Sequence, residues 1–343
     1  MRKLARLETI EAIRPIPNAD AIEVAVIGGW DVVVKKGEFA ANDEVVYCEY
    51  DSWIPNTIAP FLTKGVTPRI YNGVPGERLR TVKLRGQVSQ GLILNKSVLN
   101  GHSVVIGDDV SELLGIQLYE PPVHAQLQGL ARGNFPSCIR KTDQERFQNI
   151  LAKIHQSIED NDEYEITLKL DGSSFTAYEH EGHIGICSRN LELKFEGNEQ
   201  NSYVKMFHEG NFSKIFEQFQ GIAIQGELMG PGIQKNREDF AGACLFVFDI
   251  FDIKRGQYMS PIERKEVFKR VSVISAARIN HVPVLGQYFL KDLVKHETLK
   301  EDLLKLADRG SLNHRVAEGL VFKRIDGQFS FKVINNRFLL NEK

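Results

Sequence analysis

The sequence contains few cysteines, no long apolar run and no excess of charge of one sign, and each absence excludes a class of protein. Its four cysteines, in 343 residues, have no C-x-x-C spacing, which argues against a structural zinc site or a disulfide framework. No stretch approaches the roughly 18 apolar residues of a membrane span, and the N-terminal segment has no apolar run of signal-peptide length. We therefore expect a soluble protein of the cytoplasm or another intracellular compartment, with no membrane partner.

Charge balance and length set the next limits. Forty-three lysines and arginines against 45 aspartates and glutamates give a formal net charge of −2. Such a protein has no global positive field to attract nucleic acid, so any nucleic-acid-binding surface must be a local patch. A hydrophobic content of 42% suits a globular chain, and at about 150 residues per domain the length predicts two domains.

Residues 1–117 have the pattern of a small all-β domain. Runs of β-branched and aromatic residues at 22–27, 30–34 and 44–48 are separated by glycine-containing turns. About five strands in a hundred residues would fit an OB-type barrel, a fold that often binds oligonucleotides. The pattern alone leaves other all-β domains open.

One segment of this domain concentrates positive charge. Basic side chains there could neutralise phosphates, and an aromatic ring among them could stack on a base. We therefore predict a nucleic-acid-binding surface, with a solvated strand face as the alternative. Its residues are Arg69, Tyr71, Arg78, Arg80, Lys83 and Arg85, against the single acid Glu77.

Residues 118–135, rich in proline and glycine, are predicted to be a linker. In the remainder, 136–343, Thr142 and Glu145 have the spacing of a capping box and predict a helix that carries Arg146.

Further helix and strand signals alternate along residues 136–343. Ser260 followed by proline predicts a second helix start, and a third helix is expected over 291–307. The sequence thus predicts an α+β two-domain protein, in which an N-terminal all-β OB-type barrel precedes a mixed α+β domain. Strands of the second domain are expected at 165–170, 175–178, 222–228, 245–250, 319–323 and 330–334.

The sequence has no Walker-type phosphate loop and no G-x-G-x-x-G that opens a helix, which disfavours P-loop and Rossmann sites. Instead, Lys169 stands at a strand end and is followed by the turn Asp171-Gly172. A lysine amine can be a nucleophile where burial or nearby positive charge lowers its pKa. A surface lysine in a hairpin is the alternative.

Other short motifs follow in a fixed order. Glu227 lies between glycines at a strand end, and Phe246 and Phe248 share one strand face because side chains two apart point the same way. Glu318 and Lys323 then flank an apolar strand, and Lys332 lies on the last one.

Taken in order, these motifs resemble the covalent nucleotidyltransferase superfamily of ATP-dependent DNA and RNA ligases and GTP-dependent capping enzymes. Ser188-Arg189-Asn190 stands in the place of that superfamily's arginine segment. The resemblance covers about residues 130–343 and implies a nucleotidyltransferase (adenylyltransferase) domain over 136–343.

The position of the barrel-like domain narrows the resemblance. It precedes the catalytic domain, whereas DNA ligases and capping enzymes carry their OB domain after the last lysine motif. The layout resembles the Deinococcus-type RNA ligases (RNA ligase family 5). That resemblance implies sealing of 5′-phosphate/3′-hydroxyl nicks in duplexes, with RNA on the 3′-hydroxyl side. We expect a monomer without an obligate protein partner.

The resemblance also implies roles for the matching residues. Lys169 would attack the α-phosphorus of ATP and carry AMP, beside Asp171, which would orient it or hold a metal-bound water. Glu318 would lie near the lysine and the metal, directly or through water. The neutral amine is expected to be favoured by Lys323, Lys332 and a divalent cation, Mg²⁺ with Mn²⁺ as a substitute.

The implied nucleotide contacts complete the expected site. They are Glu227 with the ribose, Arg189 with the sugar or an incoming end, Phe248 or Phe246 with adenine, Lys332 and Lys323 with the α-phosphate, and Arg146 with the β- and γ-phosphates.

One position departs from the family pattern. Many relatives have K-x-K in the last motif, whereas Ile334 stands in the place of the second lysine. Either Lys332 suffices or a basic neighbour such as Arg337 takes that role. A DNA ligase and a GTP-using capping enzyme remain alternatives within the superfamily. A non-catalytic RNA-binding OB protein is the alternative of another class.

Overall fold

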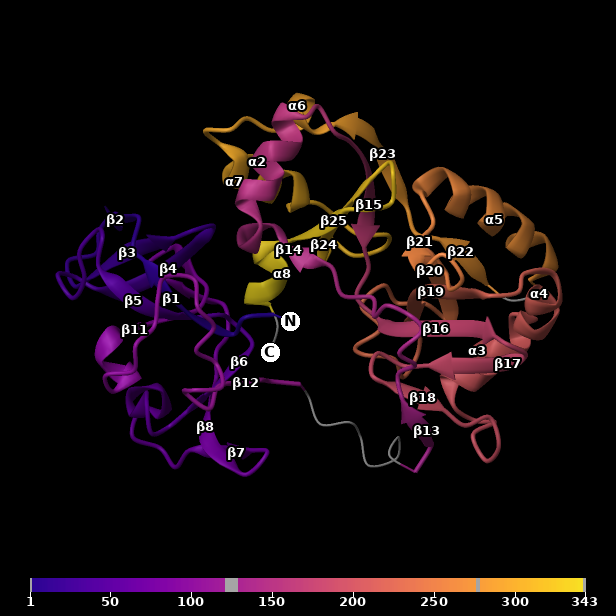
Figure 1. Cartoon of the computed structure of the whole chain (residues 1–343), viewed down its shortest axis with the longest axis horizontal. Coiled ribbons are helices and arrows are strands. Elements are labelled where there is room, and N and C mark those ends of the chain that lie inside the picture. The colour runs from indigo at the N-terminus through magenta and orange to yellow at the C-terminus, as the bar shows by residue number, and fades with distance from the viewer. Residues whose placement is uncertain (1, 121–128, 276–277, 342–343) are drawn as a thin grey trace. The chain divides into compact units, whose positions relative to one another are not determined.

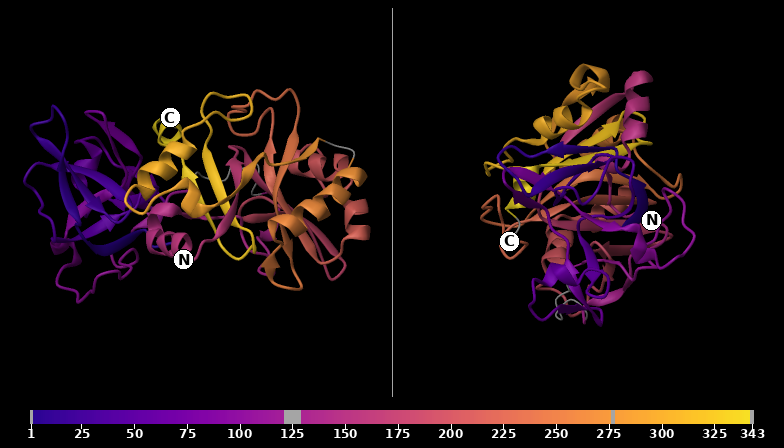
Figure 2. Two further views of the ribbon diagram at one scale, coloured as in Figure 1. Left: turned by 90° about the horizontal axis from the view of Figure 1, so that it is seen from above. Right: turned by 90° about the vertical axis from the view of Figure 1, so that its left-hand side faces the viewer.

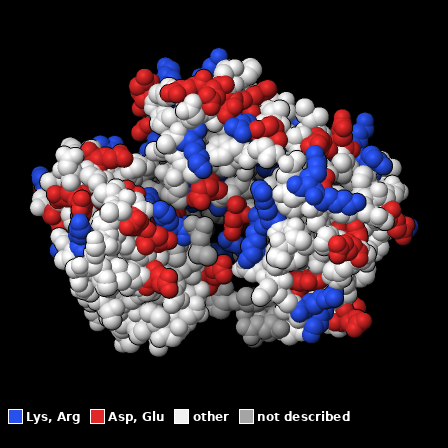
Figure 3. Space-filling view, in the orientation of Figure 1, with Lys and Arg blue, Asp and Glu red and all other residues white. Residues whose placement is uncertain are grey.

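The computed structural model describes residues 2–120, 129–275 and 278–341. The chain divides into two compact units, Met1–Pro122 and Val123–Lys343 (Figures 1 and 2). Within the described ranges, no helix is long and apolar enough to cross a membrane. On the visible face of each unit, acidic and basic side chains both occur (Figure 3), and the formal net charge of the chain is −2.

Over residues 2–120, the first unit is built from short strands in four sheets. The predicted strands at 22–27, 30–34 and 44–48 are confirmed as β3, β4 and β5. The sheets have the orders β1-β5-β11, β2-β3-β4, β12-β6-β8-β7 and β10-β9. The strands are β1 (Ala5–Thr9), β2 (Ala12–Pro15), β3 (Ile22–Ile27), β4 (Trp30–Lys35), β5 (Glu44–Cys48), β6 (Ser52–Pro55), β7 (Arg69–Tyr71), β8 (Val74–Arg78), β9 (Val82–Leu84), β10 (Gln87–Ser89), β11 (Leu92–Asn95) and β12 (Gln117–Leu118).

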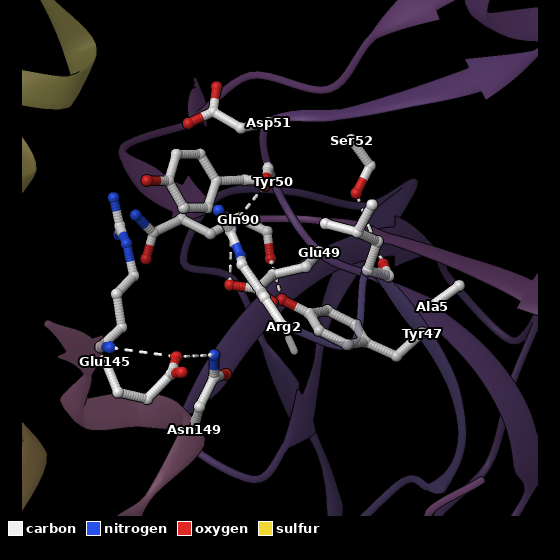
Figure 4. A network of polar contacts seen from close by, with 12 residues as sticks. Arg2, Ala5, Tyr47, Glu49, Tyr50, Asp51, Ser52, Gln90, Glu145 and Asn149 are labelled. Atoms are coloured by element: carbon white, nitrogen blue, oxygen red, sulfur yellow. Dashed lines mark hydrogen bonds and ion pairs between the residues drawn. The ribbon is translucent and has the colours of Figure 1, made fainter. Parts of the chain in front are cut away.

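The core of the first unit forms around β5. Val46 lies opposite Leu7 of β1 and Leu94 of β11, and all three are buried. A buried carboxylate, Glu49, pairs with Arg2 at 2.7 Å (Figure 4). Pairing of this kind satisfies a charge that would otherwise be costly to bury.

The described residues of the second unit form two sheets. An eight-stranded sheet has the order β13-β18-β17-β16-β19-β20-β21 with β22 beside β20, and a five-stranded sheet has the order β14-β25-β24-β15-β23. The strands are β13 (Ala131–Asn134), β14 (Glu145–Arg146), β15 (Glu163–Lys169), β16 (Ser173–His180), β17 (His183–Cys187), β18 (Leu191–Leu193), β19 (Ile222–Met229), β20 (Cys244–Asp252), β21 (Gln257–Tyr258), β22 (Ile279–His281), β23 (Val284–Phe289), β24 (Gly319–Arg324) and β25 (Ser330–Ile334).

Helices cover one face of each of these sheets. Side chains from α2, α6 and α7 join the apolar core of the five-stranded sheet, and those from α3, α4 and α5 join the core of the eight-stranded sheet. The helices are α2 (Leu151–Glu159), α3 (Ser202–Glu209), α4 (Phe212–Gln218), α5 (Pro261–Ile274), α6 (Leu290–Leu293), α7 (Leu299–Ala307) and α8 (Asn336–Leu340).

Two local predictions about helices differ from the structure. Glu145 and Arg146 form β14, parallel to β25, and the helix begins only at Leu151. Glu145 accepts a hydrogen bond from Asn149 Nδ2 at 2.8 Å (Figure 4), so the predicted capping box is wrong. The helix expected over 291–307 is divided into α6 and α7. By contrast, the start predicted at Ser260 is confirmed, with a complete capping box to Glu263.

The predicted linker also ends earlier than expected. Residues 131–134 form β13, which pairs with β18 and therefore belongs to the second unit's sheet. Residues 121–128 of that segment lie outside the described residues.

Candidate active site

One face of the five-stranded sheet is polar and carries most of the predicted site. Residues alternate along each strand, so those that pack against α2 and α7 leave their neighbours on the opposite face. In the strand register, Lys169 lies opposite Gly319, which lies opposite Ile334. In the next row, Val321 lies opposite Lys332, which pairs with Arg146 of β14.

Lys169 forms an ion pair with Glu318 across the end of this sheet. The Nζ–Oε1 distance is 2.7 Å, and both side chains are largely buried. Burial alone would lower the pKa of the Lys169 amine, but Glu318 and Glu227 outweigh it and raise the pKa above its ordinary value. The carboxylates around Lys169 thus favour its charged form, and the expectation that a divalent cation favours the neutral amine stays a prediction.

Glu227 lies on β19 beside the turn that follows Lys169. It accepts a hydrogen bond from the Gly172 N–H at 2.9 Å. Burial raises the pKa of its carboxyl to about 7, with Lys169 opposing the shift and Glu318 adding to it. Only glycine fits at 172, because a Cβ there would lie 2.5 Å from the Leu228 carbonyl oxygen.

Asp171 completes a group of three carboxylates around Lys169. Burial and the nearby Glu318 raise the pKa of Asp171. Its carboxylate lies 3.7 Å from Nη1 of Arg237, a residue from the loop between β19 and β20.

Lys332 lies near enough to the nucleophile candidate Lys169 for their charges to interact. Burial, followed by Lys169 and Arg146, lowers the pKa of Lys332 to about 8. The structure thus brings together Lys169, Lys332 and Arg146 on one sheet face, as a cluster of positive charge opposite the carboxylates.

Lys323 lies elsewhere on the same face. Its Nζ pairs with Asp249 Oδ1 at 2.6 Å and donates to the Phe248 carbonyl oxygen. Burial lowers the pKa of Lys323 to about 8 against the effect of Asp249. In the strand register Lys323 lies opposite Glu165, four residues along β15 from Lys169, so its expected place beside the nucleophile is wrong.

Phe246 and Phe248 contact the same apolar cluster, as their spacing predicts. They differ in exposure, because Phe246 is buried against Phe240 with ring centroids 5.8 Å apart, whereas Phe248 is only partly buried. The pairing of β19 with β20 is irregular between Gln225 and Gly226, which lie opposite Asp249 and Val247. Phe248 therefore has no residue opposite it in the register. Phe248 is therefore the ring that remains open to a ligand.

Arg189 is exposed and pairs with Asp143, with both carboxylate oxygens at 3.1 Å from Nη2. Burial would raise the pKa of Asp143, but Arg189 and Lys332 hold it below its ordinary value. Sequence reasoning missed Asp143 and Arg237 as members of the site. Neither residue belongs to a motif named in the sequence analysis.

Ile334, which occupies the position of the missing motif lysine, and Arg337, the candidate to replace that lysine, are placed differently. Ile334 is buried. Arg337 lies on α8, is 55% exposed and pairs with Asp308 at 2.9 Å.

The predicted basic surface of the first unit divides into two groups. Tyr71 packs against Trp53 and Tyr119 at centroid distances of 5.4 and 5.0 Å, and Arg78 pairs with Asp51 over the Tyr119 ring. These two are held by intramolecular packing. The exposed basic residues are Arg69, Arg80, Lys83 and Arg85.

Buried charged side chains of the second unit form a network around Arg264. Arg264 of α5 is fully buried, pairs with Glu165 of β15, and lies 3.7 Å from Asp249. It also donates to Nε2 of His281 at 3.1 Å, while His281 Nδ1 lies 2.7 Å from the Val282 carbonyl oxygen. His281 is therefore neutral, with its proton on Nδ1, and burial and Arg264 lower its pKa to about 4.

Replacing His281 by glutamine is expected to reduce the acid sensitivity of the second unit. The folded pKa of His281 lies below its ordinary value of 6.5, so the unfolded chain binds this proton first as the pH falls. Between pH 7 and pH 4 the parent should thereby lose on the order of 2 to 3 kcal/mol that H281Q retains. Denaturant unfolding followed by circular dichroism at both pH values measures this. Equal losses in parent, H281Q and the exposed control H208Q would contradict it.

The three carboxylates suit a hard cation. Oxygen ligands are those that Mg²⁺ and Mn²⁺ prefer, and Mg²⁺ is often bound by one or two carboxylates, with water and phosphate oxygens completing the shell. Among the described residues, no group of three His, Cys, Asp or Glu side chains could hold a metal by itself. Glu318 and Asp171 therefore fit a cation that is completed by water and a phosphate ligand.

Comparisons with known proteins agree on both units. A family model described as RNA ligase matches residues 162–334, and a model of an OB-fold domain matches residues 4–96. The predicted OB-type barrel followed by a nucleotidyltransferase domain is thereby confirmed. Comparison with curated proteins gives no match.

Solved structures of an RNA ligase from Naegleria gruberi are similar over nearly the whole chain. The complex with pyrophosphate is 41% identical, covers 100% of this chain and 99% of that chain, and has a TM-score of 0.87. A lysine-to-methionine mutant with AMP and Mn is 41% identical, with 98% of each chain covered and a TM-score of 0.88. A lysine-to-alanine mutant with ATP and Mn has the same identity and coverage and a TM-score of 0.87.

Proposed function

This chain belongs to the RNA ligase family, and from that premise we propose that it seals 5′-phosphate/3′-hydroxyl nicks in duplex nucleic acid through AMP linked to Lys169. It is an ATP-dependent RNA ligase, and we assign it to the Deinococcus type (RNA ligase family 5), with RNA on the 3′-hydroxyl side of the nick. The observation that carries the proposal is the ion pair of Lys169 with Glu318 on the sheet face that also carries Lys332 and Arg146.

The reaction has three steps. Lys169 Nζ forms a bond to the α-phosphorus of ATP as the bond to pyrophosphate breaks, which leaves AMP as a phosphoramidate. The 5′-phosphate at the nick then attacks this phosphorus and releases the lysine. Finally the 3′-hydroxyl attacks the activated 5′-phosphate, forms the phosphodiester and releases AMP.

The first step requires Lys169 to lose a proton. Its raised pKa means that the resting amine is protonated, and Glu318, at 2.7 Å, is the nearest base to receive the proton. A negatively charged triphosphate would interact with Lys332 and Arg146, the positive groups on the same sheet face. A divalent cation held by Glu318 and Asp171 would supply further positive charge to the phosphates when bound.

The remaining contacts follow from exposure and hydrogen bonding. Phe248, the more open of the two phenylalanines, would stack on adenine, with Lys323 donating to its carbonyl oxygen from behind. Glu227 would accept a hydrogen bond from the ribose. Arg189 would release Asp143 and bind either the sugar or the incoming end of the nucleic acid.

The nucleic acid would use the first unit as well. The exposed basic residues Arg69, Arg80, Lys83 and Arg85 would bind backbone phosphates. Binding through these contacts should weaken as salt rises, and it should do so equally for different sequences.

The test is incubation of the purified protein with α-labelled ATP, or α-labelled GTP, and Mg²⁺ or Mn²⁺, followed by a denaturing gel. The label is expected on the protein with ATP alone. Sealing is then measured on nicked duplexes with RNA or DNA at the 3′-hydroxyl, and only the RNA-ended nick should be joined efficiently. Labelling by GTP, or absence of labelling in folded protein that is not already adenylylated, would overturn the proposal.

A further inference from the structure

Arg237 reaches the site from a loop that no sequence motif marked. The loop, residues 230–243, connects β19 to β20. The guanidinium carbon lies 4.5 Å from the ring centroid of Phe338 on α8, and Nη1 lies 3.7 Å from Asp171 Oδ2. Asp171 is two residues from the nucleophile candidate Lys169, so the guanidinium of Arg237 lies near the group that would react.

The loop holds Arg237 between two anchors. On one side, Asn236 exchanges two hydrogen bonds with the backbone of Phe240, at 3.0 and 3.2 Å. On the other, the buried carboxylate of Glu238 accepts from the Asn313 N–H at 2.6 Å, and Asn313 Nδ2 donates to the Glu238 carbonyl oxygen at 2.9 Å. The backbone around Arg237 is thus fixed, and the ring of Phe338 limits where the guanidinium can lie.

The electrostatics favour a further partner for this guanidinium. Its contact with Asp171, at 3.7 Å, is longer than the 2.7–2.9 Å of a direct charge-assisted hydrogen bond. The side chain keeps 18% of its surface exposed. A guanidinium is planar and carries five donors, and its fork matches the oxygens of a phosphate group.

We propose that Arg237 binds a phosphate group of the substrate at this site, an assignment that rests on the proposed function. Two parts of the substrates could supply this phosphate group, the triphosphate of ATP and the 5′-phosphate at the nick. Arg237 selects for the phosphorylated ligand in either case, because its fixed guanidinium offers donors that an uncharged end cannot satisfy.

Two substitutions in the full chain test the assignment. R237M removes the charge and keeps an unbranched side chain against Phe338, whereas R237K keeps a charge without the fork. R270M is the matched control, because Arg270 lies on α5 with its guanidinium carbon 4.6 Å from the ring of Phe219. It removes the same kind of contact from a part of the unit that carries no site residue.

Binding is measured by calorimetry with two probes, inorganic tripolyphosphate and a nicked duplex with either a 5′-phosphate or a 5′-hydroxyl. R237M is expected to weaken one of the two phosphate-dependent affinities about 10-fold or more, as loss of a charge-assisted hydrogen bond requires, and R237K should recover part of it. Weaker tripolyphosphate binding would identify ATP as the source. Loss of the preference for the 5′-phosphate would identify the nick. Unchanged binding of both probes would overturn the assignment.

A double mutant distinguishes phosphate binding by Arg237 from a purely structural role, in which Arg237 only orients Asp171. Single-turnover labelling with ATP and transfer of AMP to the nick are measured for R237M, D171N and the pair. Independent phosphate binding predicts that R237M lowers one step further in the D171N background. No further loss would overturn the assignment. Because the probes bind without reaction, their result stands even if the protein forms no AMP adduct, which would refute the proposed function alone.

Discussion

Replacing Lys169 by methionine is expected to abolish AMP labelling of the protein, with a decrease of at least about 10³-fold, as loss of a covalent nucleophile causes in other enzymes. The phosphoramidate cannot form without the ε-amine of Lys169. Lys332 and Lys323 share the sheet face, but Lys323 is committed to Asp249 and Lys332 lies in another row of the strand register. Labelling with α-labelled ATP on a denaturing gel measures the effect.

The control for this prediction is K153M, which removes an exposed lysine of α2. It should label as the parent does. Circular dichroism and the thermal midpoint establish that K169M is folded. The label on the parent should also be released by acid, as a phosphoramidate is, and survive alkali. A folded K169M protein that still carries the label would refute the assignment of the nucleophile.

The strands of the site could be predicted because their pattern is local. Residues 330–334 alternate between the helix-covered core and the polar face, and the structure has β25 at those residues. The same alternation places Lys332 and Ile334 on one face and Phe331 on the other. Because buried and polar residues alternate within such a strand, the sequence alone could predict which of its residues share the polar face.

Contacts between distant segments could not be predicted in this way. The Thr142–Glu145 spacing has the form of a helix cap, yet Arg146 pairs in parallel with Lys332, nearly two hundred residues later. Thr142 instead lies 3.1 Å from the hydroxyl of Ser174. A local signal was overruled because the strand pairing forms only in the folded unit.

The same limit explains the errors within the site. Lys323 of the neighbouring strand β24 was expected to act on Lys169, but it lies opposite Glu165 in the register and pairs with Asp249. Arg237 belongs to a loop without periodicity, so its contact with Asp171 follows only from how the loop is anchored. Motif order predicted which residues form the site, whereas the contacts of those residues depend on the three-dimensional fold.

The partners of Lys323 lead to the network around Arg264, which lies behind Phe248. Asp249 follows Phe248 and joins Lys323 to Arg264. Arg264 in turn joins α5 to β15 through Glu165. The network therefore connects β20 of the eight-stranded sheet, which carries Phe248, to β15 and β24 of the five-stranded sheet. Its charges are buried, so each depends on its partners.

Replacing Arg264 by methionine is expected to destabilise the second unit by roughly 3 to 5 kcal/mol, the usual cost of breaking a buried ion pair. Glu165 would keep only Lys265, whose side chain is 39% exposed, and Nε2 of His281 would lose its donor. Replacing both partners, as in E165M/R264M, should recover part of the loss, because no unpaired carboxylate then remains at position 165. Denaturant unfolding measures both variants.

The placement of tryptophan supplies the control within the same sample. The chain's two tryptophans, Trp30 and Trp53, both lie in the first unit. Tryptophan fluorescence should therefore report the first unit and stay unchanged in R264M, while the circular dichroism transition of the second unit moves to lower denaturant. R270M, which removes an exposed arginine of the same helix, should leave both signals in place. A loss below about 1 kcal/mol in R264M, the level of a surface pair, would mean that Lys265 and Lys323 suffice to hold the buried carboxylates.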